Sequence, residues 1–301
     1  MKREWILEAE NLCYTYEDSE EPALCGVDLK IARGEKVAVL GANGSGKSTF
    51  FLCLNGILKP RTGNLKIDGQ RVDYSRKGLQ ALRKKVGIVF QDPDSQLFCA
   101  SVYQDISFGI LNLGVPEREA RKEVEQVIRE LGITPFQHRP VHALSGGQKK
   151  MVSIADILVM HPEMIILDEP ASSLDSKHVK QVRRVVESMS GQGITVIIAT
   201  HDMEYAYGWA DRMVLMHEGR VLKEGTPQAV CADLEALCKV NQKEPEALQL
   251  YRLLRESKKL DPTFSPPRDM EELKNYIRQE KPVSYLDRDK RKKGKEKERE
   301  R

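Results

Sequence analysis

The chain has 301 residues, of which 40% are hydrophobic and 31% are charged, so it can bury one large core and keep a polar surface. Its 48 lysines and arginines nearly balance its 45 aspartates and glutamates, and this balance argues against a dedicated nucleic-acid binder, whose affinity would depend on a basic surface. The six cysteines are scattered and form no C-x-x-C pair, which argues against a zinc site or a disulfide framework and favours reduced thiols.

The sequence shows no targeting segment and no membrane-spanning segment. No apolar run approaches the roughly 20 residues that cross a bilayer. No hydrophobic signal-peptide region follows the charged N-terminus, which reads Met1-Lys2-Arg3-Glu4. We therefore expect a cytoplasmic protein that reaches a membrane only through a partner.

The first ninety residues are predicted to form mainly strands and turns. Apolar and polar residues alternate in places, and short apolar runs lie between turn sequences. Asp68-Gly69 suits the tight turn of a hairpin. Strands are expected at residues 6–10, 26–31, 36–40, 64–67 and 86–90.

Helical patterns dominate residues 95–160, and strand-like runs return after them. Residues 116–131 carry apolar side chains at helical spacing and are followed by Gly132, a typical helix stop. Because strands alternate with helices, we expect an α/β fold with a mostly parallel sheet, into which the block 95–160 is inserted as a helical subdomain. The later strands are expected at residues 164–167, 195–199, 213–216 and 221–223.

The chain is predicted to contain one large domain and an appendage. The main domain is expected at residues 1–226, followed by a mostly helical extension at residues 227–286. Residues 287–301 contain nine basic and five acidic residues, so we expect a solvated, disordered tail. Helices in the extension are expected at residues 227–239, 245–258 and 270–278.

A glycine-rich loop follows the apolar strand at residues 36–40. It fits the pattern G-x-x-x-x-G-K-[ST] and precedes a helix that is expected to begin near Lys47. The glycines allow successive backbone N–H groups to point at phosphate oxygens, and the helix N-terminus adds partial positive charge. Lys47 is expected to reach the β- and γ-phosphates of a nucleotide, and the Ser48 hydroxyl to ligate Mg²⁺. The loop comprises Gly41, Ala42, Asn43, Gly44, Ser45, Gly46, Lys47, Ser48 and Thr49.

Two acids end the apolar run at residues 164–167. A strand that is buried on both faces brings its terminal carboxylates to the carboxyl edge of the sheet, beside the phosphate loop. We assign Asp168 to Mg²⁺ and Glu169 to the base that polarises the attacking water. An ordinary acidic turn would explain the two acids alone, but not their place downstream of a phosphate loop.

The sequence Leu144-Ser145-Gly146-Gly147-Gln148 narrows the family. With these residues the chain resembles the ATP-binding cassette (ABC) family, whose signature LSGGQ precedes a helix. The resemblance covers about residues 4–225, and the other motifs follow in the family's order. They are Gln91 after a strand, the signature, Asp168-Glu169, Ser172-Ser173-Leu174-Asp175 and His201, with Tyr16 in the place of the aromatic residue that stacks on adenine.

The resemblance implies both a fold and a site. The fold is that of a P-loop NTPase whose ABC-type nucleotide-binding domain combines a mostly parallel core sheet, an antiparallel β subdomain and an inserted helical subdomain. The signature of one subunit completes the ATP site of a second subunit, and hydrolysis removes the γ-phosphate that bridges the two chains. Taken alone, His201 could be a structural histidine and Tyr16 an aromatic residue of a half-buried strand. Their places in the motif order instead favour a role for both in the ATP site. The implied catalytic residues are Glu169, His201, Gln91 and Lys47; the Mg²⁺ ligands are Ser48, Gln91 and Asp168; and the ATP contacts are Tyr16, the loop from Gly41 to Thr49, Ser145, Gly146, Gly147, Gln148 and Asp175.

Two positions depart from the family's pattern. Met151 stands where an arginine is common after the signature, and Asp156 lies where a small residue is usual on the same helix. Neither belongs to the expected site, so both are expected to affect the helical subdomain and not the chemistry.

Two segments resemble the energy-coupling factor importers, and especially their cobalt-type ATPase: residues 86–98 and residues 101–109. In that group two ATPases, identical or related, dock on a transmembrane coupling subunit, which serves a separate substrate-binding membrane subunit. The resemblance implies an ATPase at the cytoplasmic face of the cell membrane that powers uptake of a micronutrient. A cobalt ion is favoured over a vitamin, although a membrane subunit chooses the solute.

An apolar cluster lies close to Gln91 in the sequence. Leu97, Phe98 and Val102 are expected to form a docking groove for a membrane partner, or else to belong to the core of the helical subdomain. Two rival functions stay open. A soluble ABC ATPase acting on nucleic acid or ribosomes would use the charged tail, but it usually carries two cassettes or a coiled-coil insertion. A P-loop kinase for small molecules would not need the LSGGQ signature.

Overall fold

The computed structural model describes residues 4–279 and divides the chain into two compact units between Lys243 and Glu244. The expected tail at residues 287–301, together with residues 280–286 of the expected extension, lies outside the described residues. Among residues 4–279, no helix has both the length and the apolar character that a bilayer crossing requires.

A six-stranded sheet forms the centre of the first unit. Its strand order is β10-β9-β3-β8-β7-β6; β9, β3, β8, β7 and β6 run parallel, and β10 pairs antiparallel with β9. All residues of β6, β7 and β8 are buried, as expected for strands covered on both faces. The predicted α/β class with a mostly parallel sheet is therefore confirmed. The bounds are β3 (Lys36–Leu40), β6 (Val86–Val89), β7 (Met164–Asp168), β8 (Thr195–Ala199), β9 (Arg212–His217) and β10 (Arg220–Gly225).

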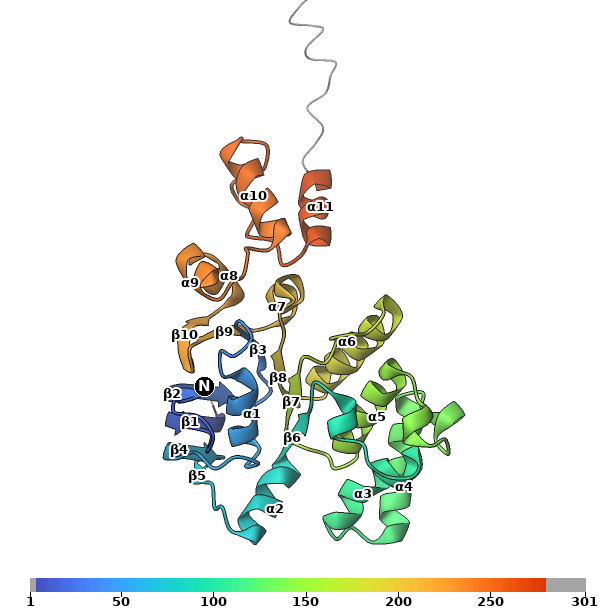
Figure 1. Ribbon diagram of the computed structural model, residues 1–301. Coiled ribbons are helices and arrows are strands. Elements are labelled where there is room, and N and C mark those ends of the chain that lie inside the picture. Colours follow the sequence, from blue (N-terminus) through green and yellow to red (C-terminus); the bar gives the residue numbers. More distant parts are fainter. Residues whose placement is uncertain (1–3, 280–301) are drawn as a thin grey trace, which may run out of the picture. The chain divides into compact units, whose positions relative to one another are not determined.

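A four-stranded antiparallel sheet packs against the first through the helix α1 (Lys47–Leu54) (Figure 1). Because both sheets contribute to one core, α1 is buried around most of its circumference and includes Phe50 and Phe51. This sheet is the antiparallel subdomain that the sequence predicted. Its strands, in the order β2-β1-β4-β5, are β1 (Trp5–Tyr14), β2 (Leu24–Ala32), β4 (Thr62–Ile67) and β5 (Gln70–Arg71).

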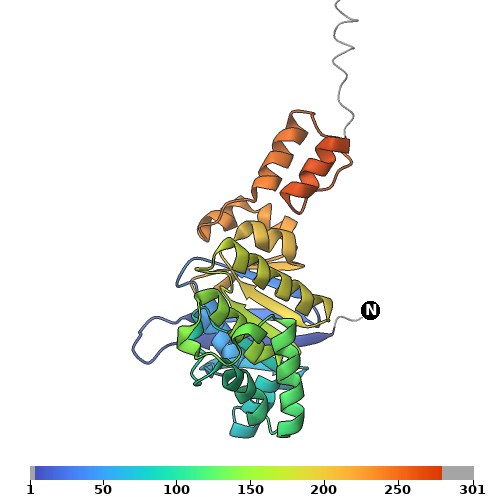
Figure 2. The ribbon, with the colours of Figure 1, turned by 90° about the vertical axis from the view of Figure 1, so that its right-hand side faces the viewer.

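The helical subdomain lies on the opposite side of the central sheet from the antiparallel strands (Figures 1 and 2). It consists of α3 (Val102–Asn112), α4 (Glu117–Glu130) and α5 (Gly146–Leu158), which pack on one another, and it falls within the expected block 95–160. Three further helices were not predicted: α2 (Arg76–Lys85), α6 (Ser176–Gly191) and α7 (Met203–Trp209). The buried residues of α6, Val182, Val186 and Met189, have helical spacing, so the sequence did contain a signal for this helix.

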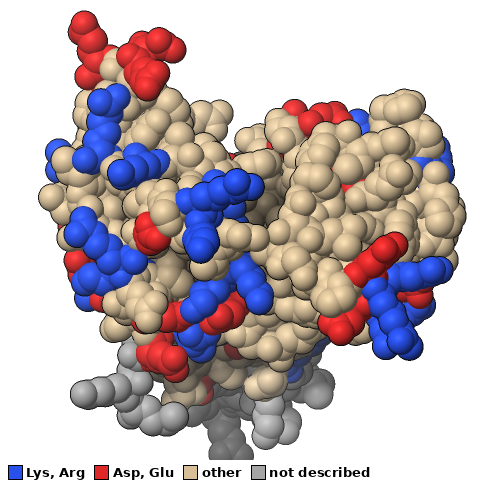
Figure 3. Space-filling view, turned by 90° about the horizontal axis from the view of Figure 1, so that it is seen from below, with Lys and Arg blue, Asp and Glu red and all other residues tan. Residues whose placement is uncertain are grey.

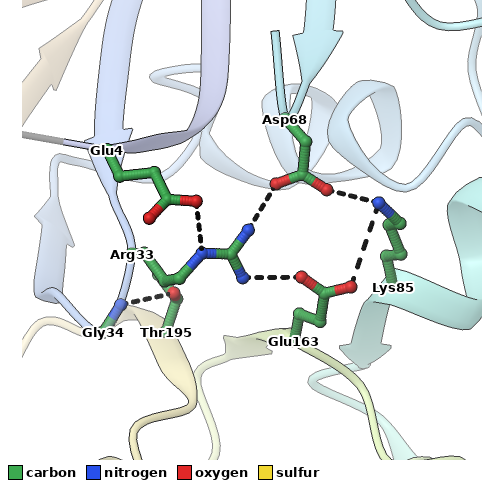
Figure 4. Close-up of polar contacts among 7 residues, drawn as sticks. All are labelled: Glu4, Arg33, Gly34, Asp68, Lys85, Glu163 and Thr195. Carbon is green, nitrogen blue, oxygen red and sulfur yellow. Dashed lines mark hydrogen bonds and ion pairs between the residues drawn. The ribbon is translucent and has the colours of Figure 1, made fainter. Parts of the chain in front are cut away.

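An ion-pair network joins the two sheets at the end of the molecule remote from the phosphate loop (Figure 4). The Arg33 guanidinium lies 2.6 Å from Asp68 of the β4–β5 turn and 2.6 Å from Glu163, which immediately precedes β7. Glu4 contacts Arg33 at 3.3 Å, and Lys85 bridges Asp68 and Glu163. Because these side chains are partly exposed, each pair contributes little alone, but the shared charges hold the turns in register.

The first unit is longer than the sequence predicted. The expected boundary after residue 226 falls short, because α8 (Pro227–Cys231) and α9 (Leu234–Lys239) pack on β9 and β10. The single helix expected at residues 227–239 is also wrong, since the chain breaks at Asp233. The Asp233 carboxylate accepts the backbone N–H of Ala236 at 3.0 Å and so begins a new helix as its N-cap.

The second unit is a small helical pair. It contains α10 (Glu246–Glu256) and α11 (Met270–Gln279), in agreement with two of the predicted helices. The rings of Phe264 and Tyr276 stack with centroids 4.4 Å apart, and the Tyr251 hydroxyl donates to the Phe264 carbonyl at 2.6 Å. These contacts fasten the connecting segment to both helices.

Candidate active site

Four parallel strands of the central sheet end at the same edge. The phosphate loop follows β3, Glu169 follows β7, His201 follows β8 and Gln91 follows β6. Together with Tyr16 and Asp168 they line a cavity of about 910 Å³. Four residues that were not expected at the site also line it: Ala23, Val240, Asn241 and Gln242. No local motif marks them; Ala23 immediately precedes β2, and residues 240–242 follow α9, beyond the expected end of the domain.

The phosphate loop is held tightly before α1 begins. Gly46, the N-cap of α1, has φ of +100°, a conformation that side-chain-bearing residues rarely adopt. A Cβ at Gly46 would also lie 2.7 Å from the carbonyl oxygen of Ala23, so glycine is required on two grounds. The Ser45 Oγ is buried and has no hydrogen-bond partner among the described residues. The phosphate loop therefore contains a hydroxyl donor that no other described residue uses.

Lys47 lies across the loop. Its Nζ donates to the carbonyl oxygens of Gly41 at 2.8 Å and Ala42 at 3.1 Å, and the residue is only 8% exposed. Burial lowers the pKa of the Lys47 ammonium, and the negative charges of Glu169 and Asp168 partly oppose this shift. A buried cation that has only neutral carbonyl acceptors would gain from an anionic ligand.

Glu169 and His201 form a pair at the cavity wall. The Glu169 Oε2 lies 2.9 Å from the His201 Nδ1, and the carboxylate is mostly shielded while the imidazole is 71% exposed. Glu169 adopts φ of +44°, and its backbone N–H donates to the Ala199 carbonyl at 3.1 Å. The sequence analysis placed both residues at the site but did not foresee that His201 would orient Glu169. A strained backbone at this position is typical of functional residues.

Tyr16 closes the side of the cavity next to α1. Its hydroxyl lies 3.0 Å from the Thr49 Oγ1, and its ring, 41% exposed, packs edge-on against Tyr14. An exposed ring face beside a phosphate loop suits the stacking of an adenine base.

The loop that carries Gln91 is anchored by a lysine that the sequence analysis missed. The Lys150 Nζ donates to the carbonyl oxygens of Phe90 at 2.8 Å and Gln91 at 2.7 Å, and the residue is 1% exposed. Burial lowers the pKa of Lys150 to about 8, against the attraction of Asp168 and Asp92. Lys150 lies on α5, so it ties the signature helix to the loop after β6.

The signature residues do not line the 910 Å³ cavity of their own chain. Ser145 caps α5 in a capping box: its Oγ accepts the Gln148 backbone N–H at 3.3 Å, and the Gln148 Oε1 accepts the Ser145 N–H at 3.1 Å. Gly146 instead lines a separate cavity of about 310 Å³, shared with Gln91 and the segment 172–174.

Gly147 fixes the contact between the signature and α6. A Cβ on Gly147 would lie 2.2 Å from the His178 ring, so only glycine allows this approach. The His178 Nδ1 in turn lies 2.8 Å from Asp175, whose other oxygen caps α6 by accepting the N–H groups of Lys177 and His178. These hydrogen bonds to His178 lower the pKa of the Asp175 carboxyl. Asp175 thus lies outside the 910 Å³ cavity, next to the signature.

The two departures from the family pattern lie in the interior of the helical subdomain. Met151 is 2% exposed. Asp156 retains some exposure as a residue, but its Oδ1 is buried and has no hydrogen-bond partner among the described residues. Burial, and then the charge of Asp105, raise the pKa of the Asp156 carboxyl well above its ordinary value, while a 3.4 Å hydrogen bond from Gln96 partly opposes this. The native state therefore favours the protonated acid.

This shift predicts a pH-dependent stability. Because the folded-state pKa of Asp156 lies above the unfolded value of about 3.9, the folded chain binds more protons, and Asp156 should reduce stability as pH rises from about 4 through the raised pKa. We expect Asp156→Asn to raise the free energy of unfolding at pH 7.5 by about 1–3 kcal/mol and to flatten its pH dependence. Urea titrations across this pH range measure both. Glu119→Gln, on the exposed face of α4, is the matched control, and an equal gain there would contradict the assignment.

Only part of the apolar cluster near Gln91 is exposed on the surface. Leu97 and Val102 are buried, which confirms the alternative that they belong to the core of the helical subdomain. Phe98 is 67% exposed and packs edge-on against Phe108, and Leu111 is exposed nearby on α3. Figure 3 shows the molecule from below, with the helical subdomain on the right. A hollow separates its largely uncharged surface from the left-hand lobe, on which Lys and Arg side chains gather.

Comparison with known proteins agrees with this geometry. The family model described as ABC transporter matches residues 24–172. A protein of Clostridium perfringens named energy-coupling factor transporter ATP-binding protein EcfA2 is 47% identical over 254 residues, which cover 84% of this chain and 89% of that protein. A protein of Methanothermobacter thermautotrophicus named energy-coupling factor transporter ATP-binding protein EcfA is 45% identical over 250 residues, covering 83% of this chain and 80% of the relative.

Solved structures share the fold. The structure of cbiO1 from Clostridium perfringens, described as part of the ABC transporter complex cbiONQ, has a TM-score of 0.69 and 46% identity and covers 85% of this chain and 99% of that one. A dimeric, post-hydrolysis state of the ATP-binding cassette MJ0796 bound to ADP and Pi has a TM-score of 0.67 and 28% identity, covering 73% of this chain and 98% of that one.

Proposed function

Because the chain belongs to the ABC family as an ATP-binding subunit of the energy-coupling factor type, we propose that it powers uptake of a micronutrient by ATP-driven closure of a dimer. The protein is an ATPase. One observation supports dimer closure above the others: the phosphate loop and the signature of one chain lie in separate cavities. A nucleotide in the larger cavity would therefore need the signature of a second chain to be enclosed.

The residues of the larger cavity suit ATP with Mg²⁺. The Ser48 hydroxyl, the Asp168 carboxylate and the Gln91 side chain all offer oxygen ligands, which Mg²⁺ prefers. Because these three residues line the cavity together with the phosphate loop, we assign Mg²⁺ to them and to phosphate oxygens, where it would neutralise phosphate charge.

The protein's own groups would supply binding and proton transfer. Lys47 would turn from its carbonyl acceptors to the β- and γ-phosphates, and Tyr16 would stack on adenine. Glu169 would accept the proton of the attacking water, and His201 would hold the Glu169 carboxylate in place. From the second chain, Ser145 and the N–H groups at the start of α5 would contact the γ-phosphate, and Asp175 would link the two sites.

We assign the docking surface for a membrane partner to the exposed aromatic pair of the helical subdomain. Phe98 and Phe108 present apolar rings next to a cavity of about 810 Å³ between α3 and α4. Lys150, on α5, donates a hydrogen bond to the Gln91 carbonyl, and α5 packs on α3. Movement at Gln91 would therefore be transmitted through α5 and α3 to this surface. The partners would be a transmembrane coupling subunit and a substrate-binding membrane subunit, with the chain peripheral at the cytoplasmic face.

The solute is proposed as a cobalt ion, with a vitamin as the alternative. The relative cbiO1 is described as part of the complex cbiONQ. Because a membrane subunit would choose the solute, the residues of this chain do not identify the solute directly. The second dimer subunit is either an identical or a related chain. The rival function on nucleic acid or ribosomes loses support, because the relatives are named as transporter subunits.

Purification from membranes tests the proposal. We expect the tagged full chain, purified from its cell membranes in mild detergent, to retain a transmembrane coupling subunit and a substrate-binding membrane subunit, and the cells to take up radioactive cobalt. Phe98→Glu should abolish retention while leaving ATP binding intact, and Leu234→Glu, at an exposed residue of α9 outside the helical subdomain, serves as the control. Retention of RNA that salt releases, without membrane subunits, would contradict the proposal. Uptake of a labelled vitamin alone would reassign the solute.

A further inference from the structure

Cys13 and Cys25 lie directly opposite each other on the adjacent antiparallel strands β1 and β2. Both are free thiols and both are half-buried. Their neighbours Leu12 and Leu24 are fully buried in the core between the sheets. Since successive side chains of a strand alternate between its faces, the two cysteines share the outer face of the antiparallel sheet.

The backbone pairing makes this a close pair. The Cys13 carbonyl accepts the backbone N–H of Arg61 at 2.9 Å, on the side of β4, and the Cys25 N–H donates to the Gly219 carbonyl at 2.9 Å. Each cysteine thus turns its backbone hydrogen bonds away from the other, as in the non-hydrogen-bonded position of an antiparallel ladder. There the Cα atoms lie about 4.5 Å apart, within the range of about 4.4–6.8 Å that a disulfide spans.

Two offsetting irregularities precede the pair. An extra residue of β1 between Ala9 and Leu12 is followed by Gly26, an extra residue of β2 between Val27 and Cys25. Gly26 adopts φ of +83°, which a side-chain-bearing residue rarely does. The two shifts cancel, so Cys13 faces Cys25 in the same register in which Ala9 faces Leu29. The Cys13 Sγ contacts the Asn11 carbonyl at 3.8 Å and the Cys25 Sγ contacts the Pro22 carbonyl at 3.6 Å, so both thiols must turn from these acceptors to form a disulfide.

Two of the other thiols are less suited to oxidation. Burial raises the pKa of the Cys53 thiol to about 12, and burial together with Asp105 raises the pKa of the Cys99 thiol to about 11. Such thiols provide little of the reactive thiolate. Cys231 is buried, and Cys238 is exposed on α9.

We propose that Cys13 and Cys25 form a dithiol site that a low-molecular-weight disulfide oxidises to a disulfide between β1 and β2. One cysteine thiolate attacks the small disulfide, forms a mixed disulfide and releases the first small thiol. The other cysteine thiolate then attacks the protein sulfur of the mixed disulfide, and the second small thiol leaves. The two protons lost by the cysteines end on the two released thiols.

The cross-link would act on the nucleotide site through the loop that it closes. Residues 14–24 lie between the two cysteines and carry Tyr16, whose hydroxyl contacts Thr49. Strand pairing already joins the loop at Tyr14 and Leu24, and the cross-link would keep this base from opening, so less entropy would be lost when adenine stacks on Tyr16. We expect the oxidised chain to bind ATP about 2–5-fold more tightly than the reduced chain. The effect on affinity rests on the proposed stacking of adenine on Tyr16, whereas the cross-link itself depends neither on the transported solute nor on membrane partners.

Peptide mapping of the full chain tests the site. We expect reduced protein treated with oxidised glutathione to lose two hydrogens and to yield a linked peptide containing Cys13 and Cys25, and dithiothreitol to reverse this. Cys238→Ser should form the link as the wild type does. Cys13→Ser should instead retain one glutathione on Cys25, because the second attack is then missing. A stable double glutathione adduct on the wild type, or links only between other cysteines, would overturn the proposal.

Titration with ATP tests the consequence. The affinity is measured for the oxidised and reduced wild type and for Cys13→Ser under both conditions. Tighter binding by the oxidised wild type, with no change in Cys13→Ser, is the expected result. Equal or weaker binding by a fully cross-linked chain would overturn the link between this bond and Tyr16 while leaving the transport proposal untouched.

Discussion

Glu169→Gln is expected to lower ATP turnover by about 10²–10⁴-fold while ATP still binds, because the amide cannot accept the proton of the attacking water. The substitution keeps the shape of the side chain, and its amide can still contact the His201 Nδ1, which lies 2.9 Å from the native carboxylate. Without hydrolysis the γ-phosphate persists, so the variant should accumulate as an ATP-bound dimer. Single-turnover kinetics measure the rate, and light scattering during gel filtration measures the mass.

Two further variants sharpen this prediction. His201→Ala removes the partner that orients Glu169, so it should lower the turnover rate more than the affinity for ATP. Glu119→Gln, which removes an exposed carboxylate of α4, should change neither quantity. Near-normal turnover by Glu169→Gln would show that another group is the base. An ATP-loaded Glu169→Gln protein that stays monomeric at high concentration would contradict closure of a dimer.

Lys47→Met should weaken ATP binding by about 10–100-fold and remove turnover at ordinary ATP concentrations. The ammonium is the cation of the phosphate loop, and hydrogen bonds to charged groups are worth about 1.5–3 kcal/mol each, where 1.4 kcal/mol corresponds to a factor of ten. Methionine keeps most of the length and the apolar stem of the side chain, so the loop should keep its shape. Calorimetric titration with ATP, with and without Mg²⁺, measures the loss.

Stability separates this effect from misfolding. Since burial lowers the pKa of Lys47, the fold itself disfavours the charged form, and loss of the ammonium should reduce the free energy of unfolding by no more than about 1 kcal/mol. Lys180→Met, on the exposed face of α6, is the matched control and should bind ATP normally. Unchanged ATP affinity in Lys47→Met would contradict the role of Lys47. A large loss of stability would show that Lys47 mainly supports the loop.

Short sequence segments determined the class of fold and the main parts of the site. The pattern from Gly41 to Thr49 requires glycine at fixed positions because of backbone geometry, as φ of +100° at Gly46 illustrates. The run at residues 164–167 is apolar at every position because the strand is buried on both faces. Such signals depend on neighbours in the chain, so they can be recognised before the chain is folded.

The tertiary structure alone decided how distant segments meet. The pairing of Glu169 with His201, the anchoring of Gln91 by Lys150 and the closing of the cavity by residues 240–242 join parts of the chain that carry no common pattern. Likewise, only the tertiary structure shows that Phe98 is exposed whereas its equally apolar neighbours Leu97 and Val102 are buried. Composition and spacing specify which face of an element is apolar, whereas contacts between elements depend on the order of the strands and on bulges and helix breaks. For this reason the motifs could be recognised from sequence, but the contacts that orient them could not.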